Sequence, residues 1–301
     1  GGSGAVTEDT GGGGGGGAGG GEAAVSVAWE LSVEAARFFL RMGFFRAGEE
    51  DAIPVPEQVA RVCRERFFTL SADLASGPFY WAAGGQKNSA GNDDGVDEED
   101  EEEVKERVVH GALEAMWRLH GEWSLLEEKG YRPRSKHQGL SEEEKDARSQ
   151  LLKVVGAIRN DQQAPGKSAD DATNASLGGA FSGVLLHLGL HLLARDPSSA
   201  GGGGGRAEQI GDLVETYGRL TGADSHGDDD DDADGDVDPM AVLVDVLVAA
   251  VSHPADHMVR GLRDSARRAW GMVCRVLPAS KAALDTLLAA VCGEDGVDEG
   301  E

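Results

Sequence analysis

The stretch DPMAVLVDVLVAAVSHPADHMVRGLRDSARRAWGMVCRVLPASKAALDTLLAAV (238–291) contains three apolar patterns with helical spacing, separated by Pro254 and Pro278. The first pattern places five apolar residues on one face of a helix, whereas strand alternation would scatter them over two faces. These residues are Leu243, Val246, Leu247, Ala250 and Val251. Because each apolar face needs a neighbour to cover it, the stretch predicts three helices packed together.

The ends of these helices carry capping signals. Asp238 is expected to cap the first helix, and Pro239 follows it in the first turn, where a proline loses no hydrogen bond. Ser280 is expected to cap the third helix after the break at Pro278. The predicted apolar face of the second helix is Met258, Leu262, Ala269, Met272, Val273 and Val276, and that of the third is Leu284, Leu287, Leu288 and Val291.

Helical periodicity continues upstream of this stretch. Two helices between residues 31 and 76 are expected to pack antiparallel, and 104–128 forms one helix, for which a coiled coil is the alternative. Shorter helices are expected at 146–159 and 206–220. The predicted apolar faces are Leu31, Ala35, Phe38, Met42 and Phe45; Val59, Val62, Cys63, Phe67, Leu70 and Leu74; Val109, Ala112, Met116, Leu119, Trp123 and Leu126; and, in a further helix, Phe181, Leu185, Leu188 and Leu192.

The net charge of −26 is concentrated in three acidic runs. Residues 93–103 and 224–238 contain nine acids each and 294–301 contain five, which leaves 31 acids against 28 bases elsewhere. These runs have little apolar surface to bury, so self-repulsion and chain entropy predict disorder. We interpret them as solvating spacers, with mimicry of nucleic acid toward basic proteins as the alternative.

Composition predicts a division into helical segments and low-complexity insertions. The helical parts are a pair at 22–81, repeats over 104–220 and a three-helix unit at 239–292, and the repeats are interrupted by insertions at 129–145, 160–179 and 196–206. The remaining segments are a disordered Gly-rich 1–21, acidic linkers at 82–103 and 221–238, and an acidic tail at 293–301.

Roughly nine helices, with helix pairs of about 40 residues near both ends, predict an all-α fold. We expect an irregular HEAT/armadillo-like helical-repeat solenoid with long disordered Gly-rich and acidic insertions, in which each pair buries its apolar face only against neighbours. No strict sequence period is visible, so an ordinary helical bundle is the alternative.

Three sequence segments resemble the Myb-binding protein / DNA polymerase phi (DNA polymerase V) family of nucleolar proteins, and they occur in the same order as in that family. The 238–291 stretch is similar to a family run through Asp238, Val242 to Asp245, Leu247, Pro254, Met258 to Arg260, Cys274 and Leu284 to Leu288. Residues 34–47 with 55–76 resemble its paired helices that end in a C-R-E-R-F-F-S-L-like phrase, and 181–200 resemble its G-L-hydrophobic-L segment. The matches cover about half of the chain, and long glycine and acid insertions separate them.

This resemblance implies a protein of the nucleus and nucleolus that acts in ribosome biogenesis, as a helical scaffold supporting rRNA gene transcription or pre-rRNA processing. Its implied partners are nucleolar proteins and transcription factors, with ribosomal DNA or pre-rRNA as the nucleic acid. The alternative is a transcription co-regulator that binds sequence-specific transcription factors. DNA polymerase activity, which the family name carries, ranks third, because a polymerase needs rigid carboxylates around paired metal ions and no such motif occurs here.

The candidate binding surface lies on the second helix of the 238–291 stretch. Five arginines occur there beside a single acid, Asp264. They are Arg260, Arg263, Arg267, Arg268 and Arg275. The first three share one side of a helix by their spacing and are candidates for contact with nucleic-acid phosphates or with a protein partner. Pairing with neighbouring helices or with the acidic runs is the alternative interpretation.

No residue pattern indicates a catalytic, metal or cofactor site. His187 and His191 are four residues apart, as are His253 and His257, but neither pair has a third ligand, so we expect surface or capping histidines. The cysteines form no metal or disulfide pattern, and Cys63 and Cys274 are expected to be buried in apolar faces. Apolar stretches such as 241–251 are too short to span a bilayer.

Overall fold

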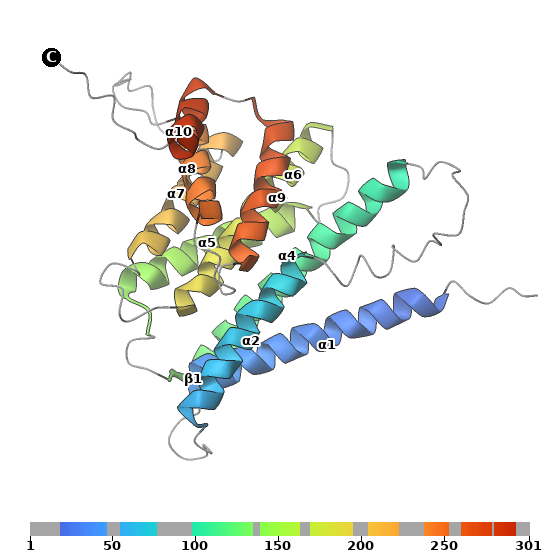
Figure 1. Ribbon diagram of the computed structural model, residues 1–301, viewed down its shortest axis with the longest axis vertical. Helices are drawn as coiled ribbons and strands as arrows, with labels where there is room; N and C mark the ends of the chain where they lie inside the picture. The colour runs from blue at the N-terminus through green and yellow to red at the C-terminus, as the bar shows by residue number, and fades with distance from the viewer. Residues whose placement is uncertain are drawn as a thin grey trace, which may run out of the picture.

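The computed structural model describes residues 19–46, 55–76, 98–134, 139–162, 169–194, 204–222, 238–252, 260–278 and 280–292. Over these residues the chain forms nine α-helices and one pair of two-residue strands, which confirms the all-α class (Figure 1). The elements are α1 (Gly19–Phe44), β1 (Phe45–Arg46), α2 (Glu57–Ser76), α4 (Glu98–Glu128), β2 (Arg132–Pro133), α5 (Glu142–Gln162), α6 (Ala169–His191), the 3-10 turn η2 (Leu192–Ala194), α7 (Gly204–Thr221), α8 (Pro239–Ser252), α9 (Arg260–Val276) and α10 (Lys281–Cys292).

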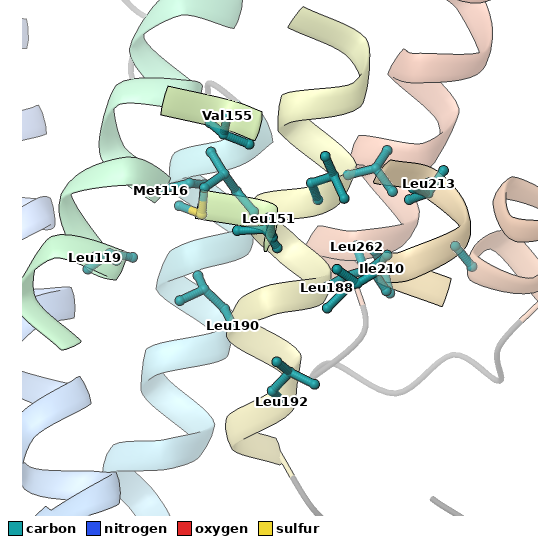
Figure 2. Packing of buried hydrophobic residues seen from close by; sticks show 14 of the residues in the cluster. Met116, Leu119, Leu151, Val155, Leu188, Leu190, Leu192, Ile210, Leu213 and Leu262 are labelled. Atoms are coloured by element: carbon teal, nitrogen blue, oxygen red, sulfur yellow. The ribbon is translucent and has the colours of Figure 1, made fainter. Parts of the chain in front are cut away.

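Helix α6 lies at the centre of the fold and packs against α4, α5, α7 and α9. Nearly every residue from 177 to 193 is buried, which is the usual state of a helix that is apolar on all sides. Figure 2 shows Leu188 close to Ile210 of α7 and Leu262 of α9. The predicted face, Phe181, Leu185, Leu188 and Leu192, is buried as expected, and the other sides of the helix are buried as well.

The same helix corrects the expectation about apolar length. The segment Ser176–Ala194 is long and apolar enough to cross a membrane by length and composition alone. In the structure 89% of it is buried inside the protein, as in the core helix of a folded domain. The HEAT/armadillo-like arrangement of the helices around α6 stays a prediction.

Helices α1 and α2 pack against each other, as predicted for the first pair. The apolar face predicted for the first helix is mostly wrong, because Leu31 and Phe38 are 65% and 53% exposed, and only Phe45, which lies in β1, is buried. The face that α1 buries consists of Val33, Ala36, Leu40 and Phe44. This helix therefore has two apolar faces, and periodicity alone does not tell which one a neighbour covers.

The face predicted for α2 is partly wrong. Its buried residues include Cys63, Phe67 and Leu74, as expected. Val59 and Val62, near the start of the helix, are exposed. Ala60, in the same turn, is fully buried, so this turn is covered and the two valines lie on a side of α2 that faces away from its neighbours.

A buried carboxylate joins α1 to α4. Glu122 accepts hydrogen bonds from Arg37 at 2.6 Å and from Arg41 at 2.9 Å, and its side chain is almost fully buried. Burial by itself would raise the pKa of Glu122, but the hydrogen bonds and charges of the two arginines outweigh burial and hold that pKa below its ordinary value. The carboxylate is therefore ionised and fixes the register of α1 on α4.

Helix α4 buries the face that its seven-residue repeat predicts. Met116, Leu119, Trp123 and Leu126 are at most 2% exposed. They face α1, α2 and α6, and the coiled-coil alternative for this helix is therefore wrong, since a coiled-coil seam would face one partner helix. The side chain of Val109 lies outside the described residues.

Several helices extend into segments predicted to be linkers or insertions. Helix α4 begins at Glu98, α6 at Ala169 and α7 at Gly204, all inside predicted low-complexity ranges. Helix α5 begins at Glu142 because Ser141 and Glu144 form a capping box, in which each side chain accepts a hydrogen bond from the other residue's backbone N–H. The division into domains stays a prediction, and most of the Gly-rich and acidic runs lie outside the described residues.

The C-terminal helices begin where the capping signals predict. The backbone N–H of Met240 donates to Asp238 at 2.9 Å, and the N–H of Ala283 donates to Ser280 at 3.0 Å. Asp238 and Ser280 also bond to each other, so the starts of α8 and α10 lie together.

The apolar faces of these helices were predicted with mixed success. The faces of α8 and α9 are buried through Leu243, Leu247, Leu262 and Val273, as predicted. The prediction for α10 is wrong, because Leu288 is 59% exposed and Leu284 is also exposed. Helix α10 makes its main contact with α8, which leaves Leu284 and Leu288 exposed among the described residues while Leu287 is partly buried.

The close approach of α6 to its neighbours predicts opposite effects for two glycines. A Cβ at Gly189 would lie 2.7 Å from His120 Cε1 and 2.9 Å from Leu151 Cδ1, so Gly189→Ala should lower the free energy of unfolding by about 1–3 kcal/mol through overpacking. A Cβ at Gly179 meets no atom within 4 Å, so Gly179→Ala should raise the free energy of unfolding by about 0.5–1 kcal/mol. Urea denaturation of both variants checks this, and equal effects would contradict it.

Buried His120 predicts loss of stability in acid. Burial lowers its pKa from 6.5 to about 3. The unfolded chain therefore binds a proton that the folded chain excludes, and each pH unit below about 6.5 costs up to about 1.4 kcal/mol through this group until the pH falls to about 3. His120→Gln should flatten the pH dependence of urea denaturation over this window. His110→Gln, at an exposed position of α4, is the control and should leave it unchanged.

Candidate nucleic-acid interface

Helix α9 separates an apolar face from a basic one. Leu262, Ala266, Ala269 and Val273 face the core, where α9 packs on α6, α2 and α8. Gly261 allows the close crossing, because a Cβ there would lie 3.0 Å from His187 Nε2 and 3.1 Å from Ala72 Cα. Packing of this apolar face fixes which residues of α9 point to solvent.

The solvent side of α9 carries what we call the arginine surface, namely Arg260, Arg263, Arg267 and Arg275. Arg267 has 62% of its side chain exposed and lies 3.8 Å from Asp264. Arg260 lies 3.5 Å from Asp73 of α2 and 3.7 Å from Asp264. Asp73 is a second acid at this surface, which the sequence did not indicate. Long, half-exposed ion pairs of this kind are weak, so they leave the guanidinium groups of Arg260 and Arg267 accessible to phosphates.

Arg263 and Arg268 lie deeper than the others. The Nε of Arg263 is buried and has no hydrogen-bond partner among the described residues. Arg268 donates to Ser265 Oγ at 3.2 Å, and burial lowers the pKa of its guanidinium, an effect that Asp264 opposes. The structure therefore separates Arg268 from the five predicted contact residues, because its side chain turns toward the core.

A buried polar cluster lies beneath Arg268. Nδ1 of His187 is 3.0 Å from the carbonyl oxygen of Gly183 and 3.1 Å from Ser265 Oγ. Burial, helped by the charge of Arg268, lowers the pKa of His187 to about 4, so the ring is neutral at physiological pH. The cluster links α6 to α9 and holds the arginine surface in place.

The cavity beside this cluster is small. Its lining includes Met116, Ala180, His187, Ser265 and Arg268, and its volume is about 20 Å³. A cavity of this size accommodates about one water molecule. Nε2 of His187 has no hydrogen-bond partner among the described residues, so the Ser265–His187 pair lacks the carboxylate of a Ser–His–acid triad within that part of the chain.

The expected surface position of His187 and His191 is wrong. They are 3% and 2% exposed, because α6 is enclosed on all sides. Across the described ranges, no group of three His, Cys, Asp or Glu side chains is arranged to hold a metal ion. His253 and His257 lie outside the described residues.

The expected burial of the cysteines holds for one of the two. Cys63 is buried, and burial raises the pKa of its thiol, an effect that Arg134 and Arg64 oppose. Cys274 is exposed, so its predicted burial is wrong. It lies on the solvent side of α9, between Val273, which is buried, and Arg275, which is exposed.

The sequence predicted the arginines of α9 but not the side chains of other helices that lie against them. Asp73 is nearly two hundred residues away from α9 in the chain, and His187 was assigned to the surface. Ser265 gave one usable signal, because it is a polar residue inside the apolar spacing of α9. Only the packing of α2 and α6 on α9 brings these side chains together.

Comparison with known proteins identifies the family. No curated protein and no solved structure matches the chain. A family model for DNA polymerase phi matches residues 23–293, which include α2 and α4 to α10 and most of α1. The match covers far more than half of the sequence, and it agrees with the resemblance that the helical phrases carry. The chain therefore belongs to the DNA polymerase phi family.

Proposed function

We propose that this chain is a non-enzymatic helical scaffold of the nucleolus that acts in ribosome biogenesis, supporting rRNA gene transcription or pre-rRNA processing. Family membership over residues 23–293 is the observation that carries the proposal. Its partners in this role are nucleolar proteins and transcription factors, together with ribosomal DNA or pre-rRNA. The HEAT/armadillo-like solenoid belongs to the same proposal, since a row of helix pairs offers a long surface for macromolecules.

The roles of three carboxylates that lie in or against the core support a scaffold over a polymerase. A polymerase holds several carboxylates around metal ions. Here Glu122 binds two arginines, Glu144 caps α5, and Asp264 lies against Arg260 and Arg267. These acids serve the fold and its surface, so we assign no nucleotidyl transfer to them.

The arginine surface supports a contact with nucleic acid. A helix that presents guanidinium groups at successive turns matches the phosphate backbone, and such contacts carry no base specificity. The surface stands out because the chain as a whole has a net charge of −26. Nucleic acid would therefore approach through α9 and avoid the acidic remainder.

A transcription co-regulator is the second candidate, and α10 favours it. Leu284 and Leu288 are four residues apart and exposed, which is the spacing by which a helix engages an apolar groove or an amphipathic partner. Sequence-specific transcription factors would be the partners in that case.

Depletion of the full-length protein tests the proposed role. Pulse-labelling of new rRNA, with precursor and mature species resolved, should show either less precursor or a block in its maturation. Unchanged rRNA together with altered messenger transcription would contradict ribosome biogenesis and favour the co-regulator.

The arginine surface makes a separate prediction about salt dependence. Arg267→Gln with Arg275→Gln should weaken binding to a duplex DNA of arbitrary sequence and reduce the slope of log K against log salt by about 2, since each lost phosphate contact removes about 0.9. Arg61→Gln with Arg66→Gln on α2 is the matched control, because it also removes two positive charges and both side chains are exposed outside this surface. An equal loss in both variants would mean that α9 is not the interface.

A further inference from the structure

The outer face of α1 is apolar and uncovered by the described residues. Val27, Leu31 and Phe38 are all more than half exposed, and Ala35 and Met42 beside them are partly exposed. Helix α1 makes its main contacts with α2, α4 and β1, all on its other side. Figure 1 shows α1 at one edge of the molecule. A helix with apolar residues on both faces usually buries both, so this face indicates a docking surface.

The spacing on this face is that of a coiled-coil seam. Leu31, Ala35, Phe38 and Met42 follow one another at intervals of four, three and four residues, which places them in a single row. The order of sizes along this row is large, small, large, large. An antiparallel second copy of the row would set Leu31 against Met42 and Phe38 against Ala35. The two central layers of the seam then each pair the large Phe38 of one chain with the small Ala35 of the other, which allows dense packing.

The charges that border the seam are also self-complementary. Glu34 and Arg41 are seven residues apart, so both lie on the same border of the row. In an antiparallel helix pair this border of one helix faces the same border of the other. Glu34 of each chain then lies beside Arg41 of the other chain, which gives two equivalent ion pairs. In a parallel pair this border would face the opposite border of the partner helix, so Glu34 would not lie beside Arg41 of the other chain.

We propose that the free face of α1 binds a second copy of this chain, by antiparallel packing of α1 on α1 through Leu31, Ala35, Phe38 and Met42. The existing ion pairs are compatible with this contact. Arg41 uses Nη2 for Glu122, and Glu34 uses Oε1 for Arg37, and both side chains remain about half exposed. The second copy needs no rearrangement of the α1–α4 contact.

The dimer should be weak, because a seam of four layers is short. We expect a dissociation constant on the order of 1–100 µM, typical of a small interface. Sedimentation equilibrium of the whole chain over a wide concentration range should show a monomer–dimer equilibrium. A chain that stays monomeric throughout this range would overturn the proposal.

Substitution on the seam tests its location. Leu31→Glu and Phe38→Glu should each raise the dissociation constant by at least about 30-fold, since every dimer would bury two new carboxylates in place of apolar side chains. Leu288→Glu is the matched control, because Leu288 is equally exposed on α10, and it should leave the dimer intact. Dimers that resist both seam substitutions, or that Leu288→Glu disrupts as strongly, would overturn the proposal.

Charge reversal tests the antiparallel register. Glu34→Arg alone and Arg41→Glu alone should weaken their own dimers, because each sets like charges together. An equimolar mixture should form a heterodimer, since both interchain pairs again join opposite charges. If mixing the two variants does not increase the amount of dimer, the antiparallel register is overturned. Arg41→Glu also places a carboxylate beside Glu122, so circular dichroism must show it folded, and the seam substitutions decide the proposal if it is not.

Discussion

The structure depends on the burial of α6 on all of its sides. An apolar helix without a polar face is stable in water only where other helices cover it completely, and α4, α5, α7 and α9 provide that cover. The tight fit at Gly189 shows how little space is left between α6 and its neighbours. The positions of the surrounding helices, and hence of everything they present to solvent, follow from this packing.

Burial of α6 also explains the polar groups inside the protein. His120 and His187 are neutral because they are enclosed, and each has one ring nitrogen near a backbone carbonyl oxygen. Such partly satisfied groups tie neighbouring helices together at the cost of sensitivity to acid. At α9 the same packing holds the apolar side against α6 and turns the arginine surface outward, so the core and the candidate interface have a common origin.

The two ends of the fold differ from its centre. Helices α1 and α10 lie at opposite edges of the molecule in Figure 1, and both expose apolar residues. A scaffold that binds other macromolecules needs such surfaces, whereas the centre needs only to be dense. The basic surface of α9 and the apolar surface of α1 are therefore the two chemically distinct surfaces that we propose as contacts.

The sequence by itself determined the all-α class, the approximate places of most helices, the starts of α8 and α10, and the family. These features depend on local periodicity and on caps such as Asp238 and Ser280, which act within a few residues. Only the tertiary structure decided which face of α1 is buried, that His187 is enclosed and that Arg268 points inward. Periodicity identifies apolar faces but not their neighbours, and burial depends on helices that are distant in the chain.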